Sequence, residues 1–132
     1  MGKPKDVECL VAASKSAMES AYAPYSGFNV GAAVLGASGR IYTGCNVENA
    51  SYGLSVCAER TAVFKAVCEG ERAIRAVAIS NCSGKASPPC GACRQVIAEF
   101  AAPAETVFIH LASEDGVETH TLDELLPHAF KL

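Results

Sequence analysis

The sequence lacks any apolar run long enough to cross a lipid bilayer. Its longest apolar runs, such as residues 30–36, fall far short of the roughly 20 residues that a bilayer requires. No apolar signal region follows the first six residues, and position 6 is Asp6 rather than the Ser or Thr of a myristoylation site. These absences predict a cytoplasmic protein that does not bind a membrane.

Basic residues are few and scattered. Lys and Arg number 11 against 14 Asp and Glu, which gives a formal net charge of −3, and no run of basic residues forms a stripe. A dedicated nucleic-acid-binding protein usually carries such a stripe. The composition therefore predicts that nucleic acid is not a partner.

Internal repeats, low-complexity stretches and linker-like segments are also absent. The 132 residues are 50% hydrophobic and 19% charged, which excludes a disordered or collagen-like chain and suffices for a buried core. We therefore expect one domain over residues 1–132.

Hydrophobic periodicity and turn residues predict alternating helices and strands. Helices are expected over 6–21, 57–69 (ending at Gly70), 91–101 and from the cap Thr121 to Leu126, and strands over 28–35, 41–46, 75–80, 106–111 and 117–120. The first two strands form a hairpin and must pair antiparallel, whereas the strand–helix–strand units after residue 57 require parallel pairing. The predicted fold class is α/β, a mixed sheet of about five strands with helices on its faces.

The chain has seven cysteines, a high and odd number for its length. A secreted disulfide framework prefers an even number, whereas a cytosolic chain more often uses some of its thiols for a metal or for catalysis. Cys9 and Cys68 fall on predicted helix faces, where we expect them to act as small buried hydrophobic residues.

Three of the cysteines stand at the starts of two predicted helices. They occur in the motifs Cys57-Ala58-Glu59-Arg60 and Pro89-Cys90-Gly91-Ala92-Cys93. A helix N-terminus stabilises thiolates, and thiolate is the form that binds zinc. Three thiolates from adjacent helix starts can hold one Zn²⁺ per chain and leave the fourth tetrahedral position to water, as in a catalytic site.

Glu59 is the candidate proton shuttle of such a site. A carboxylate beside a water on zinc can accept its proton and pass it on. A ligand, one further residue, a Glu and a later Pro-Cys-x-x-Cys form the pattern of zinc-dependent deaminases, which has an all-cysteine variant.

Two alternatives remain open for these cysteines. A Cys-x-x-Cys at a helix start is also a dithiol redox motif, which would use Cys90 and Cys93 without a metal. Either Cys45 or Cys82 can supply a fourth zinc ligand, which would close the site and make the chain a structural zinc module. A metal assay tests the first alternative, and mutation of Glu59 tests the second.

From about Tyr22 to Phe130 the chain resembles the cytidine deaminases of the short, homotetrameric type. The most specific stretches are Pro24-Tyr25-Ser26 with Phe28, Val30-Gly31-Ala32-Ala33, residues 44–52, residues 57–62 and residues 89–95. The Asn46-Val47-Glu48 stretch separates nucleoside deaminases from the wider superfamily. The resemblance implies a three-layer sandwich with a five-stranded mixed sheet, a homotetramer, and zinc-dependent hydrolysis of cytidine and 2′-deoxycytidine to the uridine nucleosides and ammonia, a step of pyrimidine salvage.

The resemblance also implies roles for individual residues. It places zinc on Cys57, Cys90 and Cys93, with Glu59 as the shuttle. It assigns the ribose hydroxyls to Asn46 and Glu48, the pyrimidine ring to Phe28, the base carbonyl oxygen to the Ala58 amide, and a neighbouring subunit's base to Phe130. Without it, Asn46 and Glu48 are interpreted as solvent-facing polar residues beside a buried Val47, and Phe28 as a core residue.

Arg60 has a physical argument of its own. Three thiolates give the zinc site a net charge of −1, and a guanidinium that donates hydrogen bonds to the sulfurs restores some of the pull on bound water. A surface ion pair is its alternative role.

The substrate is expected to be a free nucleoside. The Glu48 carboxylate beside the ribose and the lack of a basic patch disfavour nucleotides, DNA and RNA. A deaminase of another small aminopyrimidine, such as a nucleoside antibiotic, shares the zinc motifs, and the Asn46–Glu48 pair discriminates between the two enzymes.

Overall fold

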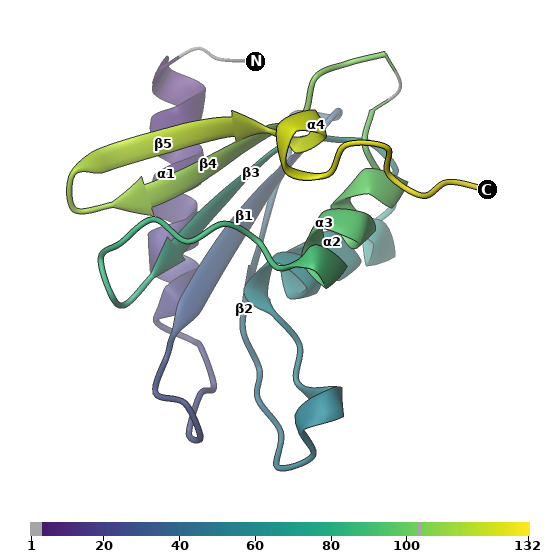
Figure 1. Ribbon diagram of the computed structural model, residues 1–132. Coiled ribbons are helices and arrows are strands. Elements are labelled where there is room, and N and C mark those ends of the chain that lie inside the picture. Colours follow the sequence, from purple (N-terminus) through teal and green to yellow (C-terminus); the bar gives the residue numbers. More distant parts are fainter. Residues whose placement is uncertain (1–3, 103) are drawn as a thin grey trace.

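The fold is built on one mixed five-stranded sheet, seen here in a computed structural model that describes residues 4–102 and 104–132 (Figure 1). The strands lie in the order β2-β1-β3-β4-β5. Their bounds are β1 Val30–Gly36, β2 Ile41–Cys45, β3 Ile74–Asn81, β4 Phe108–Ser113 and β5 Gly116–Thr121. The helices are α1 Pro4–Met18, α2 Ala58–Cys68, α3 Gly91–Glu99 and α4 Leu122–Leu125, with a short 3-10 helix η1 over Tyr52–Leu54.

The pairing directions confirm the predicted mixed sheet. Strand β1 pairs antiparallel with both β2 and β3, β3 pairs parallel with β4, and β4 pairs antiparallel with β5. The parallel step between β3 and β4 contains α3, because parallel neighbours need a crossover. The expectation of a single domain over residues 1–132 stays a prediction.

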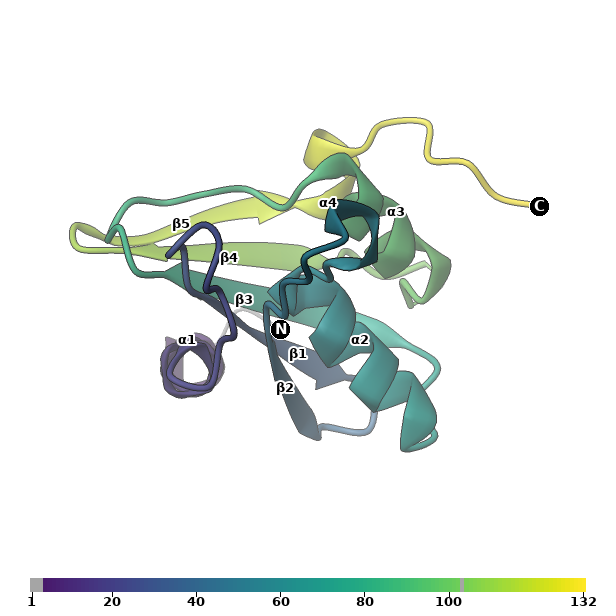
Figure 2. The same cartoon turned by 90° about the horizontal axis from the view of Figure 1, so that it is seen from below.

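Helices cover both faces of the sheet and give three layers (Figure 2). Helix α1 lies on one face, and α2 and α3 lie side by side on the other. Alternate residues of β1 point to opposite faces, so Ala32 and Val34 join the core under α2 and α3 whereas Ala33 joins the core under α1.

Helix α2 lies directly on β2 because Gly44 has no side chain. A Cβ atom at Gly44 would clash with the backbone of Ala62, and one at Gly31 would clash with Ser14 and Met18 of α1. These two close approaches fix both helices against the sheet. They also bring the first turn of α2 next to the end of β2.

Element ends differ from the predictions by a few residues. Helix α1 ends at Met18 rather than at residue 21, because the amides of Glu19 and Ser20 bond only three residues back and tighten into a turn. Strand β1 begins at Val30 rather than at Phe28, because the preceding loop bonds to side chains instead of to a strand. Thr121 caps α4 as predicted, in a reciprocal capping box with Glu124.

The prediction that Cys9 and Cys68 are buried is wrong. Both side chains are exposed. The buried positions of α1 include Leu10, Val11 and Ser14, and Cys9 lies off that stripe, while Cys68 follows the last buried position of α2 by two residues. None of the helices in the described part of the chain has the length and apolarity that a membrane span needs.

Candidate active site and metal centre

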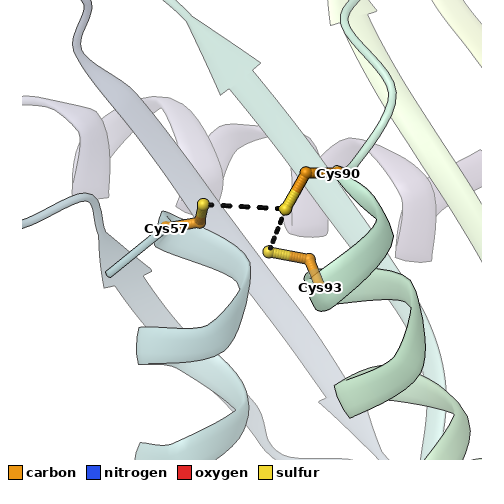
Figure 3. Close-up of side chains that lie close together, drawn as sticks. All are labelled: Cys57, Cys90 and Cys93. Atoms are coloured by element: carbon orange, nitrogen blue, oxygen red, sulfur yellow. Dashed lines mark hydrogen bonds between the residues drawn. The ribbon is translucent and has the colours of Figure 1, made fainter. Parts of the chain in front are cut away.

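Two helix N-termini bring three cysteines together. Cys57 is the N-cap of α2, Cys90 is the N-cap of α3, and Cys93 lies in the first turn of α3. Because α2 and α3 are neighbours on one face of the sheet, their N-termini lie side by side and the three thiols point toward one another (Figure 3).

The spacing of the sulfur atoms fits a zinc ion. Cys90 Sγ lies 3.8 Å from Cys57 Sγ and 3.4 Å from Cys93 Sγ, and all three sulfurs are within 4.8 Å of one another. A tetrahedral site with Zn–S bonds of about 2.3 Å places its sulfurs about 3.8 Å apart. Within residues 4–102 and 104–132 no fourth His, Cys, Asp or Glu joins this group, and Cys45 and Cys82 lie outside it.

Hydrogen bonds among the three thiols shift the pKa values of Cys57 and Cys93 in opposite directions. A hydrogen bond from Cys93 is the main cause that lowers the pKa of Cys57 to about 5, and hydrogen bonds from Arg60 and Cys90 act in the same direction. Donating to Cys57, together with burial, raises the pKa of Cys93. A metal cation takes the place of such protons, because zinc binds the thiolate form.

Arg60 lies against the sulfur cluster. Its Nη2 atom is 3.5 Å from Cys57 Sγ, and this hydrogen bond is the first cause of a raised Arg60 pKa. The guanidinium is therefore placed where it can offset part of the negative charge of three thiolates. In the described part of the chain it forms no ion pair with a carboxylate.

Glu59 is the second residue of α2, two positions after Cys57, and is buried, with 5% of its surface exposed. Burial is the main cause that raises the pKa of its carboxyl group. A carboxyl group whose pKa is raised holds a proton more readily and can return it in a later step.

A cavity of about 340 Å³ opens beside the cysteines and Glu59. All of its described lining residues are neutral or acidic, with two carboxylates and no Lys, Arg or His among them. They are Ser26, Phe28, Val30, Asn46, Glu48, Cys57, Ala58, Glu59, Ile79, Asn81, Ser87, Pro88 and Cys90. The cavity is thus lined by Cys57 and Cys90, two of the candidate zinc ligands, and by the residues predicted to contact the base and the ribose. Cys93, the third candidate ligand, is buried.

Asn46 is buried, Glu48 is half-buried and lines the cavity, and Val47 between them is 44% exposed. The interpretation of a buried Val47 flanked by solvent-facing polar residues is therefore wrong. The reason is a contact with a segment distant in the sequence: the Asn46 side chain accepts from the Val30 amide at 2.9 Å and donates to the Phe28 carbonyl at 2.8 Å. Phe28 itself is 39% exposed and faces the cavity rather than the core.

Phe130 lies outside this cavity and is 68% exposed. Its backbone carbonyl accepts from Gln95 Nε2 at 3.0 Å, which fastens the C-terminal segment to α3. The adjacent Arg94 donates to the Pro89 and Leu125 carbonyls at 2.7 and 2.6 Å. The chain segment after α4 is thus tied to the helix that carries two of the cysteines.

Sequence reasoning did not assign Ser26, Asn81 or Ser87 to the cavity. For Ser26 a signal was present, since it lies in the Pro24-Tyr25-Ser26 stretch two residues before Phe28. Asn81 is the last residue of β3, one position beyond the predicted strand, and the position of Ser87 depends on the path of the loop after β3, for which the sequence shows only turn-forming residues.

Comparisons with known proteins agree on one family. Residues 4–110 match the family model described as the cytidine and deoxycytidylate deaminase zinc-binding region. The chain is 53% identical over 126 residues to a cytidine deaminase of Sporosarcina psychrophila, covering 95% of this chain and 91% of the relative. It is 49% identical to the cytidine deaminase of Halalkalibacterium halodurans, a match that covers 95% of this chain and 94% of that relative.

A solved structure shows the same fold. The crystal structure of cytidine deaminase from Burkholderia pseudomallei superposes with a TM-score of 0.86 at 46% identity, covering 93% of this chain and 98% of that chain. The crystal structure of cytidine deaminase from Mycobacterium tuberculosis gives a TM-score of 0.80 at 39% identity, with 95% and 97% covered.

Proposed function

Because the chain belongs to the cytidine and deoxycytidylate deaminase family, we propose that its cavity binds free cytidine or 2′-deoxycytidine for hydrolytic deamination at C4. One water is consumed, and the products are uridine or 2′-deoxyuridine and ammonia. This reaction belongs to pyrimidine salvage, and we place it in the cytoplasm. The observation that carries the proposal is the cluster of three thiols beside a buried carboxyl group at a nucleoside-sized cavity.

The donor set fits one zinc ion held by Cys57, Cys90 and Cys93. When bound, zinc supplies Lewis-acid chemistry that lowers the pKa of a water molecule from about 15.7 to about 7. Arg60 beside Cys57 withdraws charge from the thiolates and so preserves part of that effect.

Four residues orient the nucleoside. The aromatic ring of Phe28 packs on the pyrimidine, and the free amide of Ala58 in the first turn of α2 donates to the base carbonyl oxygen. Asn46 and Glu48 hold the ribose hydroxyls at the other side of the cavity. Each of these contacts fixes the base so that C4 and N3 face Glu59.

Glu59 moves the protons of the reaction. It takes a proton from the attacking water and delivers it to ring N3, which makes C4 electrophilic. After the water oxygen has added to C4, Glu59 takes the remaining proton of that oxygen and transfers it to the amino group. The C4–N bond then breaks to release ammonia as the C4 carbonyl forms, and the first proton stays on N3. The burial that raises its pKa suits a carboxyl group that must hold a proton between two transfers.

The lining of the cavity supports a nucleoside rather than a nucleotide. Its two carboxylates, Glu48 and Glu59, and the lack of a cationic side chain among its described residues leave a 5′-phosphate without a partner. We extend the same inference to DNA and RNA, whose binding rests on phosphate contacts.

The assembly that fits these features is a homotetramer. Several large apolar side chains are exposed, and exposed apolar patches mark association surfaces. Around the cavity and on the C-terminal segment they are Tyr25 54%, Val47 44%, Tyr52 81%, Leu54 67% and Phe130 68%. In a homotetramer Phe130 would reach the cavity of a neighbouring copy and stack on the base there.

The ultraviolet change on mixing zinc-replete protein with cytidine tests the function. We expect loss of the cytosine absorbance with the wild type and a reduction of at least about a hundredfold with Glu59→Gln at unchanged zinc content. Cytidine monophosphate in the same assay should react far more slowly than cytidine.

Three outcomes contradict the proposal. No absorbance change at one zinc per chain would indicate another aminopyrimidine substrate or a closed structural site. No change and no zinc would favour a dithiol protein. Turnover of cytidine monophosphate at the rate of cytidine would overturn the assignment to free nucleosides.

A further inference from the structure

We propose that Ser26 is a positioning residue for ribose recognition, which orients the Glu48 carboxylate and leaves it a single acceptor position for a substrate hydroxyl. The inference rests on the proposed function of the same cavity. It goes beyond it by explaining how Glu48 is held and how many hydroxyl groups it can bind.

Three hydrogen bonds from one loop hold the Glu48 carboxylate. Its Oε1 atom accepts from the backbone amides of Tyr25 at 3.0 Å and Ser26 at 3.1 Å, and its Oε2 atom accepts from the Ser26 hydroxyl. The Ser26 hydroxyl is also the first cause of a lowered Glu48 pKa. Glu48 is therefore a carboxylate that can only accept hydrogen bonds.

Counting acceptor positions limits what Glu48 can bind. A carboxylate offers about four lone-pair positions, two on each oxygen. Both positions on Oε1 and one on Oε2 are occupied by the loop. One position on Oε2 remains, so Glu48 accepts one ribose hydroxyl, and the Ser26 hydroxyl decides which way that position points.

The Ser26 hydroxyl also stands in a directed chain of hydrogen bonds. It accepts from the Phe28 amide at 3.0 Å while it donates to Glu48. Asn46 holds the carbonyl of the same Phe28 at 2.8 Å. The backbone of the base-packing residue and the carboxylate of the ribose-binding residue are thus joined through one hydroxyl group.

Apart from its hydrogen bond with the Phe28 amide, the Ser26 hydroxyl does not hold the loop in place. Backbone hydrogen bonds run from Tyr22 to Asn46 at 3.0 Å, from Glu48 to Tyr22 at 2.8 Å and from Gly27 to Ala23 at 2.9 Å. Ser26 itself is exposed, so its removal leaves no buried cavity. We therefore expect Ser26→Ala to fold and to lose chiefly the orientation of Glu48.

A comparison of substrates tests the assignment. With Ser26→Ala we expect the KM for cytidine and 2′-deoxycytidine to rise about tenfold, the size of effect of one hydrogen bond to a charged group, with kcat changed less than about threefold. For 2′,3′-dideoxycytidine, which lacks both hydroxyls, KM should stay within about twofold of the wild type. Ser26→Thr, which keeps the hydroxyl, should restore the cytidine KM.

Two further measurements separate failure of this inference from failure of the proposed function: the double variant with Glu48→Ala, and the turnover of the three substrates by the wild type. In a Glu48→Ala background, Ser26→Ala should have no further effect on the cytidine KM. Equal losses for cytidine and 2′,3′-dideoxycytidine, or an unchanged cytidine KM, would overturn the role of Ser26 while deamination stands. Wild-type protein that turns over none of the three substrates would overturn the proposed function itself.

Discussion

Glu59 and Arg60 are consecutive residues that meet opposite electrostatic environments. The Glu59 carboxyl group is buried and its pKa is raised, so it can carry a proton. The Arg60 guanidinium contacts the Cys57 thiol and its pKa is raised, so it stays a cation. The first turn of α2 thus supplies a proton carrier to the cavity and a permanent charge to the sulfurs.

Replacement of Arg60 should impair catalysis more than folding. We expect Arg60→Gln to lower kcat/KM for cytidine about tenfold to a hundredfold, because the three thiolates then lose their cationic partner. Steady-state kinetics with parallel zinc determination measures this. Arg72→Gln is a matched control, since Arg72 donates to the carbonyls of Val67 and Glu71 and does not line the cavity. Equal kinetics for the two variants would contradict the role of Arg60.

His110 should make the stability of the protein depend on pH. The ring is buried in β4, its Nδ1 atom lies 2.9 Å from Thr119 Oγ1, and its Nε2 atom has no described partner. Burial lowers the His110 pKa from its usual 6.5. Below pH 6.5, His110 therefore binds a proton in the unfolded chain but stays neutral in the folded chain until the pH reaches its lowered pKa.

The free energy of unfolding should fall as the pH drops from about 6.5 through the folded-state pKa of His110, by at most about 1.4 kcal/mol per pH unit. Urea titrations at pH 7.5 and 5.5 and constant protein concentration measure this loss. His110→Asn, which keeps a polar atom near Thr119 but does not titrate, should lose less stability over that interval. A variant that loses as much as the wild type would show that other groups govern the change.

For single residues, the sequence predicts chemical roles better than it predicts which side chains are buried. Helix geometry is local and brings Cys90 and Cys93 onto one turn, and the motif pattern predicts Cys57 as their partner, which the packing of α2 beside α3 then supplies. The orientation of Val47 and the contact between Ser26 and Glu48 depend on a loop that pairs with a distant segment. No local pattern contains that information.

At the scale of elements, α3 links the metal centre to the C-terminal segment. Arg94 donates from the second turn of α3 to the Pro89 carbonyl, just before Cys90, and to the Leu125 carbonyl at the end of α4. Two hydrogen bonds from one guanidinium therefore join the loop that ends at Cys90 to an element more than 30 residues later.

Arg94→Ala should accelerate release of zinc to a chromogenic chelator by about tenfold, because the loop before Cys90 loses its support. The rate of zinc release from Arg94→Lys should lie between the rates of the wild type and Arg94→Ala, since an ammonium group cannot reach both carbonyls in the geometry of the guanidinium. Arg75→Ala is the control, as Arg75 pairs with Glu105 away from the cavity. Release at the wild-type rate from Arg94→Ala would contradict this link.

The predicted elements agree with the structure in kind and order, and the differences lie at their ends. Periodicity predicts which residues face a core, and the buried Ala32 and Val34 of β1 follow it. It does not predict where side chains compete with the backbone for hydrogen bonds, as Asn46 does at the start of β1. The predicted strand over 106–111 likewise shifts to Phe108–Ser113.

At the scale of the whole molecule, the described cavity is lined by residues of one chain, and Phe130 is exposed outside it. The C-terminal segment leaves α4 and runs past α3 toward the outside of the molecule (Figure 1). A homotetramer in which this segment serves a neighbour would explain why so large an apolar side chain is exposed.

Complementation between two inactive variants tests this arrangement. Glu59→Gln and Phe130→Ala chains should each be impaired alone, and co-expression should restore activity to about a quarter of wild type, since that fraction of sites combines an intact Glu59 with an intact neighbouring Phe130. Light scattering should report four chains per particle in each sample. Full activity of Phe130→Ala alone, or no gain in activity on co-expression, would contradict a role of Phe130 in the site of a neighbouring chain.

The antiparallel pairing of β1 with β3 has a consequence for how the chain folds. Each outer hairpin, β1–β2 and β4–β5, closes a short loop, whereas β1 and β3 must bring Val30 next to Asn81 across the whole of α2. Closing long loops is entropically slow, so the hairpins form early and the central pair late. Val30 and Asn81 both line the cavity. The cavity is therefore completed only when this long-range pairing closes, after both hairpins.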